Sequence, residues 1–286
     1  MGKVAEEEEQ MYPQRRMVRQ ILMLGLVVTL VVLAASACAG GAKDGAEEAS
    51  KPKPELTTVA GDGGSQLGDG GPATEAKFCG PNDVAFDTAG NTYISDGRIY
   101  CTGPGGYTVR KVDTHGTITT VAGTGEAGFS GDGGPATKAK LDVPIAVAVD
   151  REGNLYITDE SNYRIRKVDK DGIIHTIAGT GKKGYSGDGG PATEAALDDP
   201  VGIAVDGEAN VFFSDHHNNV VHEIDRNGTI TTVAGTGESG FNREKGPATK
   251  VWLNEPVGLF VDDDPGVLYI PDTFNARIRA VHLEDS

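Results

Sequence analysis

Three of the chain's six histidines lie in one short segment, DHHNNVVHE at residues 215–223. The segment DESNYRIRK at 159–167 lies 56 residues earlier and aligns with it without any histidine. Imidazole nitrogens bind zinc, and zinc sites use three or four converging ligands. His216 and His217 are therefore the candidate metal ligands. We nevertheless expect them to be loop histidines without a metal, because they come from a single segment.

A glycine pattern found in nucleotide-binding turns occurs three times, as GTGEAG at 123–128, GTGKKG at 179–184 and GTGESG at 235–240. A dinucleotide-binding turn occurs once per domain and opens a long helix. Here the pattern returns every 56 residues, and each copy leads to further glycines and a proline. We therefore exclude a nucleotide cofactor, and the fixed period indicates a repeat architecture.

Acidic residues also recur in the glycine-rich connectors. GFSGDGGPAT at 128–137 returns as GYSGDGGPAT at 184–193 and, shortened, as GDGGPAT at 68–74. Asp69, Asp132 and Asp188 would hold a cation if they converged, but glycines that permit a positive φ favour a structural turn. The fourth copy has NREK in place of SGDG, which breaks a symmetric site. Asp132 and Asp188 remain candidate ligand-binding residues.

The elements that position these residues are short strands. In the second repeat, apolar alternation predicts strands at 145–149, 155–157, 163–168 and 173–177. Gly153 and Gly172 stand in the tight turns between them, as expected for hairpins. Four antiparallel strands per repeat, without a long helix, predict one blade of a β-propeller.

The words PVGIAVD at 200–206, GNLYITD at 153–159 and NYRIRKVD at 162–169 together resemble the NHL repeat, a β-propeller module. The resemblance covers roughly residues 57–282 and implies an all-β propeller of four-stranded blades. Enzymes related to this family, such as the amidating lyases, hold zinc at the propeller axis with histidines from separate blades. His216 and His217 do not reproduce that ligand set. One fold hosts many activities, so the resemblance alone leaves the function open.

The two ends of the repeat region match each other. The last repeat stops after its third strand, ARIRAV at 276–281, and LTTVA at 56–60 copies ITTVA at 230–234. We therefore expect four blades of about 56 residues, closed into a ring by the N-terminal strand. The alternatives are a ring completed by a second chain and a sequence that is a fragment.

In a propeller, the connectors between blades and the loops between second and third strands share one face, which we call the mouth. Cys79 lies in the connector before the first blade, and Cys101 lies in an insertion at 97–106 between that blade's second and third strands. Both therefore fall on the mouth, and we predict a disulfide between them outside the cytoplasm. Two free buried thiols are the alternative. Recurring pairs such as Asp159 and Asn162 are predicted to be scaffold that caps this loop.

The N-terminus has the features of a targeting segment. Basic residues precede an apolar run from Ile21 to Ala37, and the sequence ASAC ends at Cys38. We predict a signal peptide at 1–37 with a lipobox-like end, a lipid-attached Cys38 that begins a flexible tether at 38–56, and the propeller at 57–286. An uncleaved membrane helix, ordinary secretion and a start at Met17 are the alternatives. Each version places the propeller outside the cytoplasm, and the predicted lipid anchor places it in the cell envelope.

The formal net charge of −16 disfavours a nucleic-acid partner, whose phosphates need a basic surface. The sequence contains no H-E-x-x-H motif and no recognisable Ser-His-Asp set. We therefore expect a monomeric binding module without a cofactor, which takes a protein, peptide or glycan at its mouth. The alternative is a metal-dependent propeller enzyme of lyase or lactonase type, with zinc or calcium.

Overall fold

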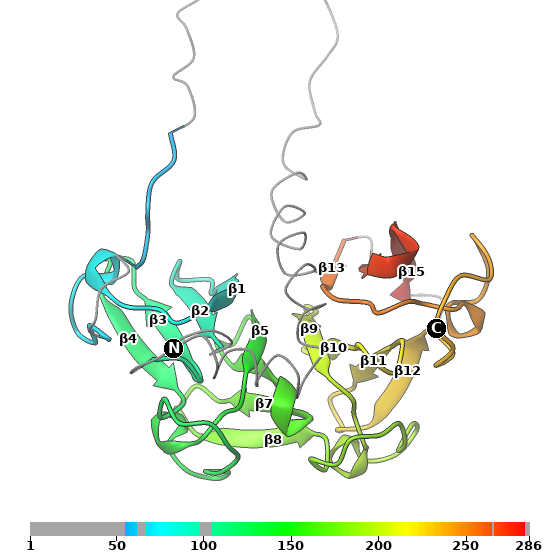
Figure 1. Cartoon of the computed structure of the whole chain (residues 1–286), viewed down its shortest axis with the longest axis horizontal. Coiled ribbons are helices and arrows are strands. Elements are labelled where there is room, and N and C mark those ends of the chain that lie inside the picture. The colour runs from blue at the N-terminus through cyan, green and yellow to red at the C-terminus, as the bar shows by residue number, and fades with distance from the viewer. Residues whose placement is uncertain (1–54, 62–66, 98–104, 265, 284–286) are drawn as a thin grey trace, which may run out of the picture. The chain divides into compact units, whose positions relative to one another are not determined.

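The computed structural model describes residues 55–61, 67–97, 105–264 and 266–283. The chain divides into the units Met1–Thr58 and Val59–Ser286, and all strands of the described residues lie in the second. They form four antiparallel sheets in chain order, coloured from cyan to red in Figure 1. Within the described residues, no helix has the length and apolar character needed to cross a membrane.

Each of the first three sheets has four consecutive strands. The first has β1 (Pro81–Phe86), β2 (Thr92–Asp96), β3 (Thr108–Val112) and β4 (Ile118–Ala122). The second has β5 (Pro144–Val149), β6 (Leu155–Asp159), β7 (Arg164–Val168) and β8 (Ile174–Ala178). The third has β9 (Pro200–Val205), β10 (Val211–Asp215), β11 (Val220–Ile224) and β12 (Ile230–Ala234). The fourth has β13 (Phe260–Asp262), β14 (Val267–Asp272) and β15 (Arg277–His282).

These sheets are the blades expected from the repeat, and the all-β propeller architecture is confirmed. The four strands predicted in the second repeat agree with β5 to β8 to within two residues at each end. Tyr163 is the informative exception. It was expected to begin the third strand but has a left-handed backbone with φ of 52°, because it ends the short 3-10 turn Glu160–Asn162.

The core lies between neighbouring blades. Buried residues such as Ile145, Tyr156 and Ile165 of the second blade form one cluster with Ile203 and Phe213 of the third. The first strands pack in order, β1 on β5, β5 on β9 and β9 on β13. Side chains of these four strands line a cavity of about 270 Å³, and all of them are Ala, Val, Ile, Leu or Phe. The cavity bounded by the first strands is therefore apolar in the side chains of its described lining residues.

Glycine at the start of each connector is a steric requirement. Gly179 has a φ of +92°, and a Cβ added there would lie 2.2 Å from the carbonyl oxygen of Tyr163. The first glycine of the GTG motif thus permits a close turn.

The connectors before the first three blades are each bonded to the fourth strand of the blade that they precede. The amide of Gly133 donates to the carbonyl oxygen of Ile174 at 2.8 Å, and the Ile174 amide donates to Gly134 at 3.0 Å. The same pattern joins Gly70 to Ile118 and Gly189 to Ile230. These three connectors are therefore part of the blades that they precede.

Closure of the ring stays a prediction. The segment expected to close it, residues 56–60, forms no strand in the structure, and the side chains of Leu56 and Val59 are exposed.

Candidate functional site

The mouth of the propeller is held together by an asparagine in the loop between second and third strands of the second, third and fourth blades. The Asn162 amide nitrogen donates to Asp159 at 2.9 Å and to the carbonyl oxygen of Gly128 in the preceding connector at 2.8 Å. Asn218 and Asn275 bind the connectors at Gly184 and Gly240 in the same way. The connectors and these loops therefore share one face, as expected, and the recurring Asp–Asn pairs are scaffold.

A buried ion pair supports this scaffold in the second blade. Asp159 is completely buried and accepts hydrogen bonds from the Asp142 amide at 2.7 Å and from Arg166 at 3.1 Å. Burial raises the pKa of Asp159 to about 6, although these hydrogen bonds oppose the shift. Arg166 also pairs with Asp132 at 2.7 Å. Asp132, a candidate ligand residue, is thus held by its own blade.

The third blade departs from this arrangement because His222 takes the place of the arginine. Its Nε2 lies 3.5 Å from the buried Asp215, and its Nδ1 lies 3.3 Å from the hydroxyl of Thr232. Asp188 accepts a hydrogen bond from the Thr232 amide. Asp132 and Asp188 therefore each face their own blade, and the structure does not bring them together around one ion.

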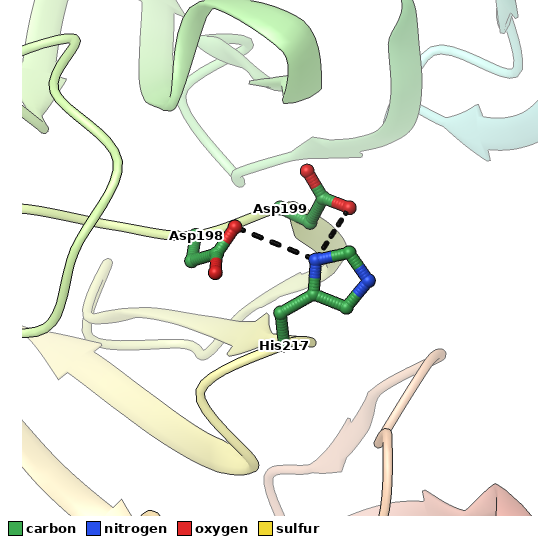
Figure 2. A group of neighbouring side chains, drawn as sticks. All are labelled: Asp198, Asp199 and His217. Carbon is green, nitrogen blue, oxygen red and sulfur yellow. Dashed lines mark hydrogen bonds and ion pairs between the residues drawn. The ribbon is translucent and has the colours of Figure 1, made fainter. Parts of the chain in front are cut away.

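The strongest candidate site lies on the mouth of this third blade. Nδ1 of His217 lies 3.0 Å from a carboxylate oxygen of Asp199 and 3.4 Å from one of Asp198, as Figure 2 shows. Lys183 approaches the same Asp198 oxygen at 3.1 Å. Hydrogen bonds to Asp198 and Asp199 raise the pKa of His217 to about 10. At neutral pH the group is therefore an ion pair between a protonated imidazole and two carboxylates.

His216 is next to this cluster but has another partner. The His216 ring is buried, and its Nε2 lies 3.3 Å from a carboxylate oxygen of Glu255. The centroids of the His216 and His217 rings are 5.1 Å apart. The hydrogen bond from His216 lowers the pKa of the Glu255 carboxyl group, although partial burial opposes this. The two predicted histidines are thus neighbours that bind different acids rather than one common ion.

Within the described residues, Asp198, Asp199 and His217 are the one group whose ligand atoms lie close enough to hold a metal. A metal there would have to displace the proton on Nδ1 and compete with Lys183 for Asp198.

Sequence reasoning missed Asp198, Asp199, Lys183 and Glu255. The repeats do contain a signal for Asp199 and Glu255. LDDP at 197–200 and LNEP at 253–256 stand where the second repeat has LDVP at 141–144. The comparison between repeats that singled out His216 and His217 would also have selected Asp199, which stands where the second repeat has Val143.

The cysteine predictions fall largely outside the described residues. Cys79 lies in the connector before β1, and its amide donates to Asp96 at 2.9 Å. A Cβ added to Gly105, at the end of the inserted segment, would lie 3.1 Å from the Cys79 sulfur. Cys101 and Cys38 lie outside the described residues, so the disulfide and the lipid attachment stay predictions.

Comparison with known proteins gives the same fold. The Teneurin NHL domain matches residues 124–186 and 181–243. NHL repeat-containing protein 2 of Homo sapiens is 26% identical over 255 residues, which cover 80% of this chain and 35% of that protein. Teneurin-1 of Mus musculus is 27% identical over 252 residues, 77% of this chain and 9% of that protein. The chain thus matches about a third or less of the length of these relatives.

One similar solved structure is a structural genomics protein of unknown function from Bacteroides thetaiotaomicron VPI-5482. It has a TM-score of 0.55 and 20% identity, and the match covers 70% of this chain and 46% of that one. At this level of identity the similarity concerns the fold.

Proposed function

We propose that this chain, which is an NHL-repeat β-propeller, is an extracytoplasmic, membrane-anchored binding module whose mouth takes a protein or peptide with basic groups. The observation that carries the proposal is the acidic cluster of Asp198, Asp199 and Glu255 on the third blade. Ion pairs with His217 and Lys183 and the contact with His216 hold these carboxylates, and a ligand's ammonium or guanidinium group can compete for them. The net charge of −16 favours the approach of such a ligand.

Aromatic side chains beside the mouth support a protein or peptide ligand. Phe129, Tyr185 and Phe241 occupy the same position in three successive connectors, and each is partly exposed. The guanidinium of Arg164 lies 3.7 Å from the Phe129 ring centroid, and that of Arg277 lies 3.9 Å from Phe241. Aromatic residues held in place and surrounded by polar groups are typical of protein interfaces.

The test is binding to arrays of short peptides that differ in lysine and arginine content, with the full chain in detergent. We expect saturable binding that weakens with salt and falls about tenfold in Asp199→Asn, which is the loss of one charge-assisted contact of about 1.4 kcal/mol. Asp171→Asn is the matched control, since Asp171 is an exposed acid in the turn before β8. Equal loss in both variants, or preference for acidic peptides, would exclude the mouth as the binding site.

Membrane anchoring is tested separately. Expression of the full chain with radiolabelled palmitate is expected to label the wild type and leave Cys38→Ser unlabelled. Label on both chains, or on neither, would contradict lipid attachment at Cys38.

The second candidate is a metal-dependent propeller enzyme, which the grouping of Asp198, Asp199 and His217 favours. Metal-dependent chemistry needs a bound ion with an open coordination position. Elemental analysis of chelator-free protein distinguishes the two functions. Stoichiometric zinc or calcium that disappears in His217→Asn would support the enzyme, and metal-free protein that binds peptide would support the binding module.

A further inference from the structure

The fourth blade has an apolar residue exposed where the other three blades have it buried. Val109, Ile165 and Val221 hold the same place on the third strands and are completely buried, each paired with an alanine of the fourth strand. Ile278 is their counterpart on β15, and it is 57% exposed. The outer edge of β15 is therefore built to carry a further strand.

A groove lies along this edge. It has a volume of about 430 Å³, and its walls include Ile278, Ala280 and His282 of β15 together with Ala248, Val251 and Leu253 of the connector. In the second blade, β8 pairs with the third strand from Ile165 to Val168. The fourth-blade groove is thus the space that a fourth strand would occupy.

Backbone amides of the connectors also indicate that a fourth strand belongs in this groove. Ala136 and Ala192 donate to residues just before the fourth strands of their own blades, at 2.8 Å in both cases. The equivalent amide in the last connector belongs to Ala248, and no partner for it occurs among the described residues. A strand in the groove would supply the carbonyl group.

The sequence that fits this groove is LTTVA at 56–60. It differs from the fourth strands β4 and β12, both ITTVA, only by leucine in place of isoleucine. The next residue, Gly61, donates to the carbonyl oxygen of Ala73 at 2.8 Å, as Gly123 does to Ala136 and Gly235 to Ala248. Gly61 therefore starts a normal connector, and residues 56–60 occupy the place of a fourth strand that precedes it.

The hydrogen bond from Gly61 to Ala73 limits which blade can receive the strand. Because Ala60 adjoins Gly61, the strand can complete only a blade that lies directly beside the first blade. Within one chain the first and fourth blades do not cover each other, since Val84, Phe86 and Phe260 on their first strands are all more than half exposed. Their counterparts on β5 lie between neighbouring blades, where Val147 and Ala148 are buried and Val149 is partly buried.

We propose that residues 56–60 of one copy form the fourth strand beside β15 of a second copy, and that the exchange is reciprocal. Following the register of β7 and β8, Thr57 lies opposite Ala280, as His175 lies opposite Lys167. The pairing covers Ile278, Leu56 and Val59 and removes an open sheet edge. Two copies joined at both ends place eight blades around one axis, in contrast to the monomer expected from the sequence.

The test uses two differently tagged full-length chains, Thr57→Cys and Ala280→Cys, co-expressed in an oxidising compartment. Directly opposed residues of antiparallel strands have Cβ atoms about 5 Å apart, near the range that a disulfide bridges. We expect a covalent dimer that carries both tags and dissociates on reduction. Lys250→Cys in place of Ala280→Cys is the control, because Lys250 is exposed on the connector outside the strand register.

Two results would overturn the proposal. The first comes from a second experiment, in which one chain carries both Thr57→Cys and Ala280→Cys. A cross-link found only within single chains of this double variant would mean that the strand closes its own ring. No cross-link in either experiment would mean that the strand does not pair with β15. Native mass spectrometry of Ile278→Glu is the second measurement. Since Ile278 is exposed in the single chain, the variant should fold and shift from dimer to monomer, and a persistent dimer would place the interface elsewhere.

Discussion

His217 should make the stability of the protein depend on pH in the alkaline range. Its pKa is about 10 in the folded chain, against about 6.5 for an unperturbed histidine. A raised pKa means that the protonated form stabilises the fold. This contribution is fully present below pH 6.5 and is lost as the pH rises towards 10.

The structure sets the size of the effect. A shift from 6.5 to about 10 corresponds to an upper bound of about 5 kcal/mol, at about 1.4 kcal/mol for each pH unit. The His217 side chain is 24% exposed, so solvent screening reduces the expected value to about 2 kcal/mol. For a domain of this size, that corresponds to a difference in Tm of about 4–8 °C.

The assay is thermal unfolding of the wild type and His217→Asn at pH 6, 8 and 10. We expect the difference in Tm to be largest at pH 6 and to shrink towards pH 10, apart from a constant offset from the two carboxylates left facing each other. His175→Asn is the control, because His175 is an exposed histidine near a single carboxylate, Asp169. A difference that stays constant from pH 6 to pH 10 would refute the assignment of a protonated His217.

Four further substitutions test the scaffold by chemical denaturation. Arg166→Met leaves Asp159 buried without its cation and should cost about 3 kcal/mol at pH 8; the loss should be smaller at pH 5, where Asp159 is protonated. Gly179→Ala should cost more than 2 kcal/mol because its Cβ meets a backbone oxygen, whereas Gly189→Ala, which has open space, should cost about 1 kcal/mol. Asn218→Ala removes the bonds to Asp215 and Gly184 and should cost about 2 kcal/mol. Equal losses for the two glycine variants, or a loss in Arg166→Met that does not change with pH, would contradict these explanations.

The blades could be predicted because their determinants are local. In the second repeat, alternating apolar residues and glycine turns define β5 to β8, and the buried face of each strand then fixes its register. The strand status of residues 56–60 could not be settled in the same way. Its sequence has the pattern of a strand, but a strand exists only when a neighbouring edge accepts it, and the position of that edge is not encoded in the segment.

The candidate site was only half predictable for a related reason. His216 and His217 stand out because they interrupt the repeat, but their acidic partners come from two different connectors. Asp198 and Asp199 precede β9, and Glu255 precedes β13. Their approach to the histidines depends on the left-handed backbone at Asp199 and Glu255, with φ of 60° and 50°. No local pattern in the sequence reveals that conformation for an acidic residue.

The hydrogen bonds that join each connector to the blade it precedes bear on how such a gene can change length. A connector and its following blade are joined into one block, because the bonds of Gly133, Gly134 and Ala136 all end within the next blade. Duplication or deletion of a whole block therefore leaves these bonds intact. Bonds between blades repeat as well, since Thr158 donates to the carbonyl oxygen of Val201 as Ser214 does to that of Val257. A cut between a connector and its blade would separate the donors of the connector from their acceptors in the blade. We therefore expect recombination to preserve the fold when it joins equivalent points of successive repeats.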